Sequence, residues 1–109
     1  MEMQEIQDSL DEMVRRIVER FNPDRIILFG SRARGTAGPD SDADLLVVMP
    51  VSGSKRKQAA QIDMALAGVG LPKDIIVVTP EEVDRYHDVV GTIIGPAIRD
   101  GEVLYERGS

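Results

Sequence analysis

Two aspartates one residue apart are the residues of this chain whose types and spacing most directly suggest chemistry. Asp42 and Asp44 flank Ala43 at the start of an apolar run that continues to Met49. Side chains alternate between the two faces of a β-strand, so both carboxylates should point the same way. Two such carboxylates repel each other unless a proton or a cation lies between them. Carboxylate oxygens are also suitable ligands for Mg²⁺ that is held jointly with substrate phosphates. The spacing therefore predicts a metal site.

A glycine and a serine follow the preceding apolar run, Arg25–Phe29. Gly30 and Ser31 leave that run, and Arg32 and Arg34 come directly after them. Glycine lets backbone N–H groups approach an anion closely, and a serine hydroxyl adds a donor. Arginine forks match phosphate oxygens, although a structural or partner-facing ion pair is an equal alternative for both arginines. A phosphate-binding turn beside a pair of metal-binding carboxylates is the smallest set of groups that phosphoryl or nucleotidyl transfer needs.

Hydrophobic periodicity indicates which elements position these residues. Apolar side chains recur at helical spacing from Ile6 to Phe21, and Asn22-Pro23 should end that helix. The continuous run Arg25–Phe29 predicts a central strand covered on both faces. Segment 36–41 is typical of a turn, and the run Leu45–Met49 predicts a second strand.

The second half of the chain should add helices, a third strand and an edge strand. Ser54 is placed to cap a helix, Asp74–Val78 predicts the third strand, and Thr79–Glu82 forms a capping box. The stripe Val90–Ile98 is interrupted by glycine and proline, so we expect a kink or two short pieces, and Val103–Tyr105 should form an edge strand. A helix between the second and third strands makes them parallel, and the short turn before it makes the first two antiparallel.

Composition narrows the functional class. The 109 residues suffice for one domain, expected over residues 1–109. The absence of cysteine excludes thiolate chemistry, and a single histidine, His87, disfavours a histidine-based zinc site. A net charge of −6 argues against broad nucleic-acid binding. No apolar run approaches membrane-spanning length and no basic apolar signal begins the chain, so a cytoplasmic setting is expected.

The combined motif resembles the signature of the polymerase-β-type nucleotidyltransferase superfamily, because the chain reads Gly30-Ser31, ten intervening residues, then Asp42-Ala43-Asp44-Leu45. The residues after the serine, Arg32-Ala33-Arg34-Gly35, are similar to those of the minimal nucleotidyltransferase (MNT) branch. The resemblance extends from about Ile6 to about Tyr105. It implies an α/β (α+β) fold: a mixed β-sheet with helices packed on one side of it.

The resemblance also implies a role for each candidate residue. Asp42 and Asp44 would hold two Mg²⁺ ions, one of them on the triphosphate of ATP. Asp74 would converge with them and share the metal that activates an acceptor hydroxyl, although it could instead be a turn residue that only starts the third strand. The implied nucleotide-binding residues are Gly30, Ser31, Arg32 and Arg34.

The activity implied is transfer of AMP from ATP to a hydroxyl of a partner protein. Minimal members are often encoded beside a small helical HEPN ribonuclease toxin, so the resemblance implies an antitoxin that modifies such a partner. A partner chain or a homo-oligomer would complete the acceptor side of the site. Two alternatives stay open: a non-catalytic binding module that acts by contact, and a small-molecule nucleotidyltransferase. The intact Gly-Ser pair and the three carboxylates favour an enzyme.

Overall fold

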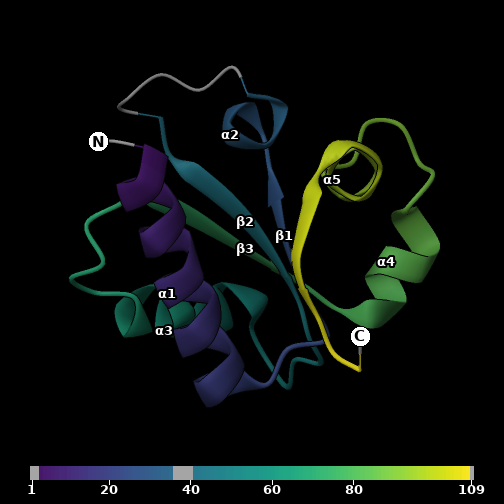
Figure 1. Ribbon diagram of the computed structural model, residues 1–109. Helices are drawn as coiled ribbons and strands as arrows, with labels where there is room; N and C mark the ends of the chain where they lie inside the picture. The colour runs from purple at the N-terminus through teal and green to yellow at the C-terminus, as the bar shows by residue number, and fades with distance from the viewer. Residues whose placement is uncertain (1–2, 36–40, 109) are drawn as a thin grey trace.

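A four-stranded sheet with the order β3-β2-β1-β4 forms the centre of the computed structural model, which describes residues 3–35 and 41–108 (Figure 1). The antiparallel pair β1 (Arg25–Phe29) and β2 (Ala43–Val48) forms its middle. On the outside, β3 (Lys73–Val78) runs parallel to β2, and β4 (Glu102–Glu106) runs antiparallel to β1. The predicted α+β class, the mixed sheet and the strand directions are confirmed.

Helices cover both faces of the sheet (Figure 1). Helices α1 (Met3–Phe21) and α3 (Lys55–Ala65) pack on one side, here called the α1/α3 face. Helices α4 (Pro80–Tyr86) and α5 (Ile94–Asp100) pack on the other, the α4/α5 face. The expectation of helices on one side only is therefore wrong. Strands β1 and β2 are apolar at nearly every position, so both of their faces need cover.

Alternation along the strands divides the core into two clusters. In β2, Leu45 and Val47 are buried toward the α1/α3 face, whereas Leu46 and Val48 are buried toward the α4/α5 face. The first cluster is completed mainly by Met13, Ile17, Ile26, Leu28, Ile62 and Leu66, and the second by Ile27, Val78, Val83, Ile94 and Ala97. The side of the sheet on which any strand residue lies can therefore be read from its position relative to these neighbours.

Local sequence signals set the starts of α3 and α4. The hydroxyl of Ser54 accepts a hydrogen bond from the Lys57 N–H at 3.2 Å, and Thr79 and Glu82 form the predicted capping box. The kinked or doubled helix expected from the stripe Val90–Ile98 is wrong, because residues 87–93 form turns and α5 begins at Ile94. Within the described residues, no helix combines the length and the apolar character needed to cross a membrane.

Candidate active site

The Gly-Ser turn joins β1 to α2 (Ser31–Arg34), a single helical turn. Gly30 has φ 78° and ψ −155°, a backbone region that is essentially restricted to glycine. Gly35, with φ 75°, ends the helix in the left-handed conformation. The motif glycine therefore permits the abrupt change from strand to helix at the end of β1.

Gly30 also lies directly against a carboxylate. A Cβ atom placed on Gly30 would overlap Oδ2 of Asp44 and would come within 3.3 Å of Cγ of the same side chain. The strand register agrees, because Phe29 of β1 pairs with Asp44 of β2. The two pieces of the motif, separate in sequence, thus form one packed unit in which the bare backbone of the glycine leaves room for the aspartate.

Two of the predicted carboxylates lie side by side on neighbouring strands. Asp44 of β2 is in register with Asp74 of the parallel strand β3. Asp44 alternates with Leu46 and Val48, so it lies on the α4/α5 face, and Asp74 has the same relation to Val78. We call Asp44 and Asp74 the cross-strand aspartates. Asp44 is half-buried and Asp74 is exposed.

The third carboxylate, Asp42, lies one residue before β2 and is exposed. The sheet hydrogen bonds begin beyond it, where the Ala43 N–H donates to the Pro72 carbonyl at 2.8 Å. Over residues 3–35 and 41–108, no three Asp, Glu or His side chains are grouped closely enough to hold a metal ion. The three-carboxylate metal set stays a prediction. Its donors fit magnesium bound with a nucleotide, because phosphate oxygens and water can supply the remaining ligands.

The arginines after the serine are placed differently from the carboxylates. Both Nε and Nη2 of Arg32 donate to the carbonyl of Ser41, at 3.0 and 2.6 Å. The observed contact is thus with the main chain, and a phosphate contact stays a prediction. The side chain of Arg34, and the predicted turn with Asp40, lie outside the described part of the chain.

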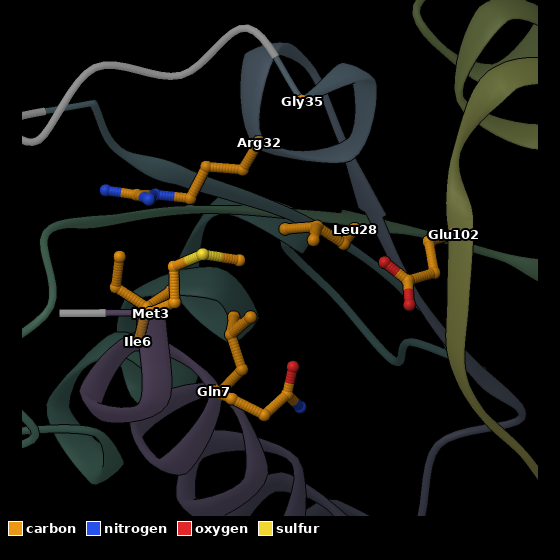
Figure 2. A pocket seen from close by; sticks show the side chains of 8 residues that line it. Met3, Ile6, Gln7, Leu28, Arg32, Gly35 and Glu102 are labelled. Atoms are coloured by element: carbon orange, nitrogen blue, oxygen red, sulfur yellow. The ribbon is translucent and has the colours of Figure 1, made fainter.

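Two cavities flank the α2 turn, one on each face of the sheet. The larger, of about 370 Å³, lies between the start of α1 and β1, with Arg32 above it and Glu102 at one side (Figure 2). The smaller, of about 270 Å³, lies on the α4/α5 face between Phe29-Gly30 and the residues of α5. None of the three motif aspartates lines either cavity. Neither of these two cavities therefore contains the carboxylates.

The smaller cavity adds residues that the motif did not indicate. Its walls include Phe29, Ile93, Pro96 and Ala97, which are apolar and adjoin Gly30. The signal available in the sequence was the apolar stripe Val90–Ile98, which indicates a buried helix face but not the strand that it meets.

Comparison with known proteins agrees with this geometry. The profile of the nucleotidyltransferase domain family matches residues 10–98, a range that includes every predicted site residue. None of the curated proteins compared with the chain matches it significantly. The fold is similar to the crystal structure of a Sulfolobus solfataricus protein provisionally assigned as a nucleotidyltransferase, with a TM-score of 0.64 and 22% identity over 98% of this chain and 91% of that one. That likeness shows the fold alone. The family match, with the Gly-Ser and Asp-x-Asp pieces packed together as the motif requires, establishes that the chain belongs to the nucleotidyltransferase domain family, in its minimal, polymerase-β-like form.

Proposed function

We propose that this protein transfers AMP from ATP, with Mg²⁺, to a hydroxyl group of a partner protein. Family membership gives the reaction class, nucleotidyl transfer. The observation that best supports the proposed reaction is the position of Asp44. It lies between the main chain of Gly30 on one side and Asp74 on the other. The turn proposed to bind phosphate thus lies beside the carboxylate proposed to hold the metal, and a second carboxylate lies on the next strand.

Each of these residues has a distinct role in the proposed reaction. Gly30 leaves room for the Asp44 carboxylate, and Ser31 supplies a hydroxyl at the first position of α2. Asp42, Asp44 and Asp74 would hold magnesium, which when bound lowers the pKa of the acceptor hydroxyl and neutralises charge at the α-phosphate. The half-buried Asp44 is held in place by its packing against Gly30, so its carboxylate is oriented before substrate arrives.

The topology supports an acceptor that approaches from outside the domain. Strand β3 is at the edge of the sheet, so the exposed Asp74 is at the open end of the aligned residues. Exposed apolar side chains on the segment before α5, including Val90 at 88% exposure and Ile93 at 44%, give a partner a surface to contact. The net charge of −6 disfavours a nucleic-acid acceptor.

The partner that we propose is a helical protein of the HEPN type, with this chain as its antitoxin. The test is to incubate the chain with ATP, Mg²⁺ and the product of the neighbouring gene. Mass spectrometry of that partner should show added AMP on tyrosine, serine or threonine. Asp42→Asn combined with Asp44→Asn should abolish the adduct without preventing association. Asp84→Asn, which changes an exposed aspartate on α4, is the matched control and should leave the adduct unchanged.

The same experiment separates the alternatives. If the double variant neutralises the partner as well as the unaltered chain does, and no adduct forms, the chain acts by contact and the proposed reaction is wrong. If AMP is instead transferred to a small molecule in the mixture while the partner stays unmodified, the small-molecule alternative is correct.

A further inference from the structure

The guanidinium of Arg32 holds the main chain immediately before the Asp-x-Asp motif. The carbonyl that accepts its two hydrogen bonds, at 3.0 and 2.6 Å, belongs to the peptide bond between Ser41 and Asp42. Two donors from one rigid, planar group restrict the direction of that carbonyl more strongly than a single bond would. Because the peptide group is planar, the same contact fixes the backbone N–H of Asp42.

Asp42 depends on this contact because the sheet does not hold it directly. It precedes β2, and the nearest sheet bond joins Ala43 N–H to the Pro72 carbonyl at 2.8 Å. The main chain of Asp42 thus lies between two anchored peptide groups, one fixed by Arg32 and the other by the loop before β3. Loss of the arginine contact removes the two hydrogen bonds that Arg32 makes on the Ser41 side of Asp42.

The position of Arg32 separates it from the face that carries the reaction. Figure 2 shows its side chain extending from α2 over Met3 and Ile6 at the start of α1. It lines that cavity with Leu28, whose side chain belongs to the α1/α3 face. Asp44 lies on the opposite, α4/α5 face. Arg32 therefore contacts the Ser41 main chain from the face of the sheet opposite to the one on which Asp44 lies.

We infer that Arg32 is a positioning residue: acting through the Ser41 carbonyl, it holds Asp42 in the geometry that the metal–nucleotide complex requires. The inference rests on the proposed function, because it assumes the metal role of Asp42. Arg32 then affects the affinity for the metal and the order of the local main chain, and it makes no direct contact with phosphate.

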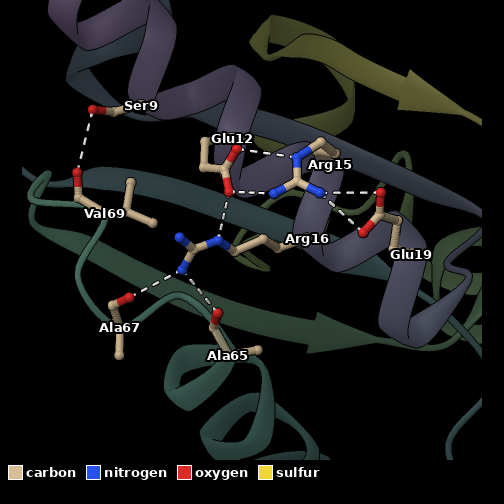
Figure 3. A network of polar contacts seen from close by, with 8 residues as sticks. All are labelled: Ser9, Glu12, Arg15, Arg16, Glu19, Ala65, Ala67 and Val69. Carbon is tan, nitrogen blue, oxygen red and sulfur yellow. Dashed lines mark hydrogen bonds and ion pairs between the residues drawn. The ribbon is translucent and has the colours of Figure 1, made fainter.

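The test compares three variants of the full chain. Arg32→Met keeps much of the apolar stem and removes the donors, and Arg32→Lys restores a single charged donor. Arg16→Met is the matched control, since the guanidinium of Arg16 also donates to main-chain carbonyls, those of Ala65 and Ala67 at 3.3 and 3.0 Å (Figure 3). For each variant, Mg²⁺ is titrated at fixed ATP, and ATP is titrated at saturating Mg²⁺.

Arg32→Met should raise the Mg²⁺ midpoint by roughly tenfold, the effect typical of residues that orient metal ligands, and change the ATP midpoint by less than about twofold. Arg32→Lys should recover part of the loss. Arg16→Met should lower the melting temperature and leave both midpoints unchanged. A weaker ATP midpoint with normal Mg²⁺ dependence would make Arg32 a phosphate ligand and overturn the inference. Equal behaviour of the Arg32→Met and Arg16→Met chains would do the same.

Amide hydrogen exchange gives a second readout that needs no nucleotide. The Ala43 amide should exchange on the order of tenfold faster in Arg32→Met, relative to β1 amides of the same variant, because the two hydrogen bonds from Arg32 no longer oppose local opening there. Unchanged exchange would contradict the positioning role. If the unaltered chain does not bind Mg²⁺ and ATP at all, the proposed function fails, and exchange at Ala43 alone decides whether Arg32 orders this segment.

Discussion

Asp44 occupies the space that a side chain on Gly30 would need. The overlap involves Oδ2 of the carboxylate, and the main chain of the glycine is at φ 78°. The glycine of a Gly-Ser motif is usually explained by the approach of a phosphate to the backbone. Here the Asp44 side chain also requires that residue 30 carry no Cβ atom. The Gly-Ser and Asp-x-Asp parts of the motif therefore constrain each other before any nucleotide binds.

Gly30→Ala should therefore destabilise the fold partly through Asp44. Asp44→Ala removes the overlapping atoms, so the double variant should be more stable than the two single changes predict, with a coupling of about 0.5–3 kcal/mol. Urea denaturation of all four chains measures it. Gly35→Ala is the control: it also has a positive φ, of 75°, but its Cβ would meet nothing within 4 Å, so its effect should simply add to that of Asp44→Ala. Additivity at Gly30 as well would show that backbone strain alone requires the glycine there.

The cross-strand aspartates should differ in their kinetic effects. Asp44→Asn should remove most Mg²⁺-dependent ATP binding, measured by calorimetry. Asp74→Asn should lower the rate of AMP transfer on the order of 100-fold with little change in ATP affinity, as for a group that assists the acceptor in the transition state. An equal loss of affinity and rate in Asp74→Asn would make Asp74 an ordinary metal ligand.

Glu12 should make the stability of the protein depend on acid pH. Its carboxylate accepts hydrogen bonds from Arg15 and Arg16, which lower its pKa from the ordinary 4.5 to about 2 (Figure 3). A carboxyl group whose pKa is lowered by folding adds stability that is complete above its unfolded pKa and is lost as the pH falls through the folded value. The urea midpoint should therefore fall between about pH 4.5 and about pH 2, and Glu12→Gln should flatten that decline.

Glu19→Gln provides the comparison for Glu12→Gln. In the described structure Glu19 bonds to Arg15 but not to Arg16, which also holds the end of α3. Its replacement should have the smaller effect on the acid decline. If the two variants decline alike, the network, and not the Glu12 carboxylate, determines the acid sensitivity.

Thr79 should contribute to stability mainly through its hydroxyl. The Thr79 oxygen accepts from the Glu82 N–H at 3.2 Å, and the Glu82 carboxylate accepts from the Thr79 N–H at 3.0 Å. A hydrogen bond from Lys55, 2.6 Å away, holds the pKa of Glu82 below its usual value. Thr79→Ala should cost about 1 kcal/mol of unfolding free energy, measured by urea denaturation. Thr79→Ser should cost much less; an equal cost would assign the effect to the lost methyl group.

The sequence predicts those parts of the fold that depend on short segments. Arg25–Phe29 forms a strand because it is apolar throughout, and Thr79 starts a helix because its partner is three residues away. The second and third strands begin one or two residues earlier than predicted, at Ala43 and Lys73, because sheet pairing extends past the apolar runs.

The missed features depend on contacts between distant segments. The location of α4 and α5 on the second face depends on which side of the sheet the chain returns to after β3, and periodicity does not encode that choice. The partner of Arg32 is a carbonyl oxygen, which every residue carries, so no residue type in the sequence could indicate it. The contact between Gly30 and Asp44 likewise required the strand register.

The pairing of β1 with β4 has a consequence for folding kinetics. It places Arg25 beside Glu106, and Arg107 forms an ion pair with Asp24, so this edge closes only when segments that are far apart in the sequence meet. The hairpin of β1 and β2 joins nearby segments and closes at a much smaller entropic cost. We expect the hairpin to be formed in the folding transition state and β4 to dock afterwards. Val103→Ala should then speed unfolding while leaving the refolding rate nearly unchanged in a chevron experiment, so loss of this edge would shorten the lifetime of the folded enzyme without hindering its formation.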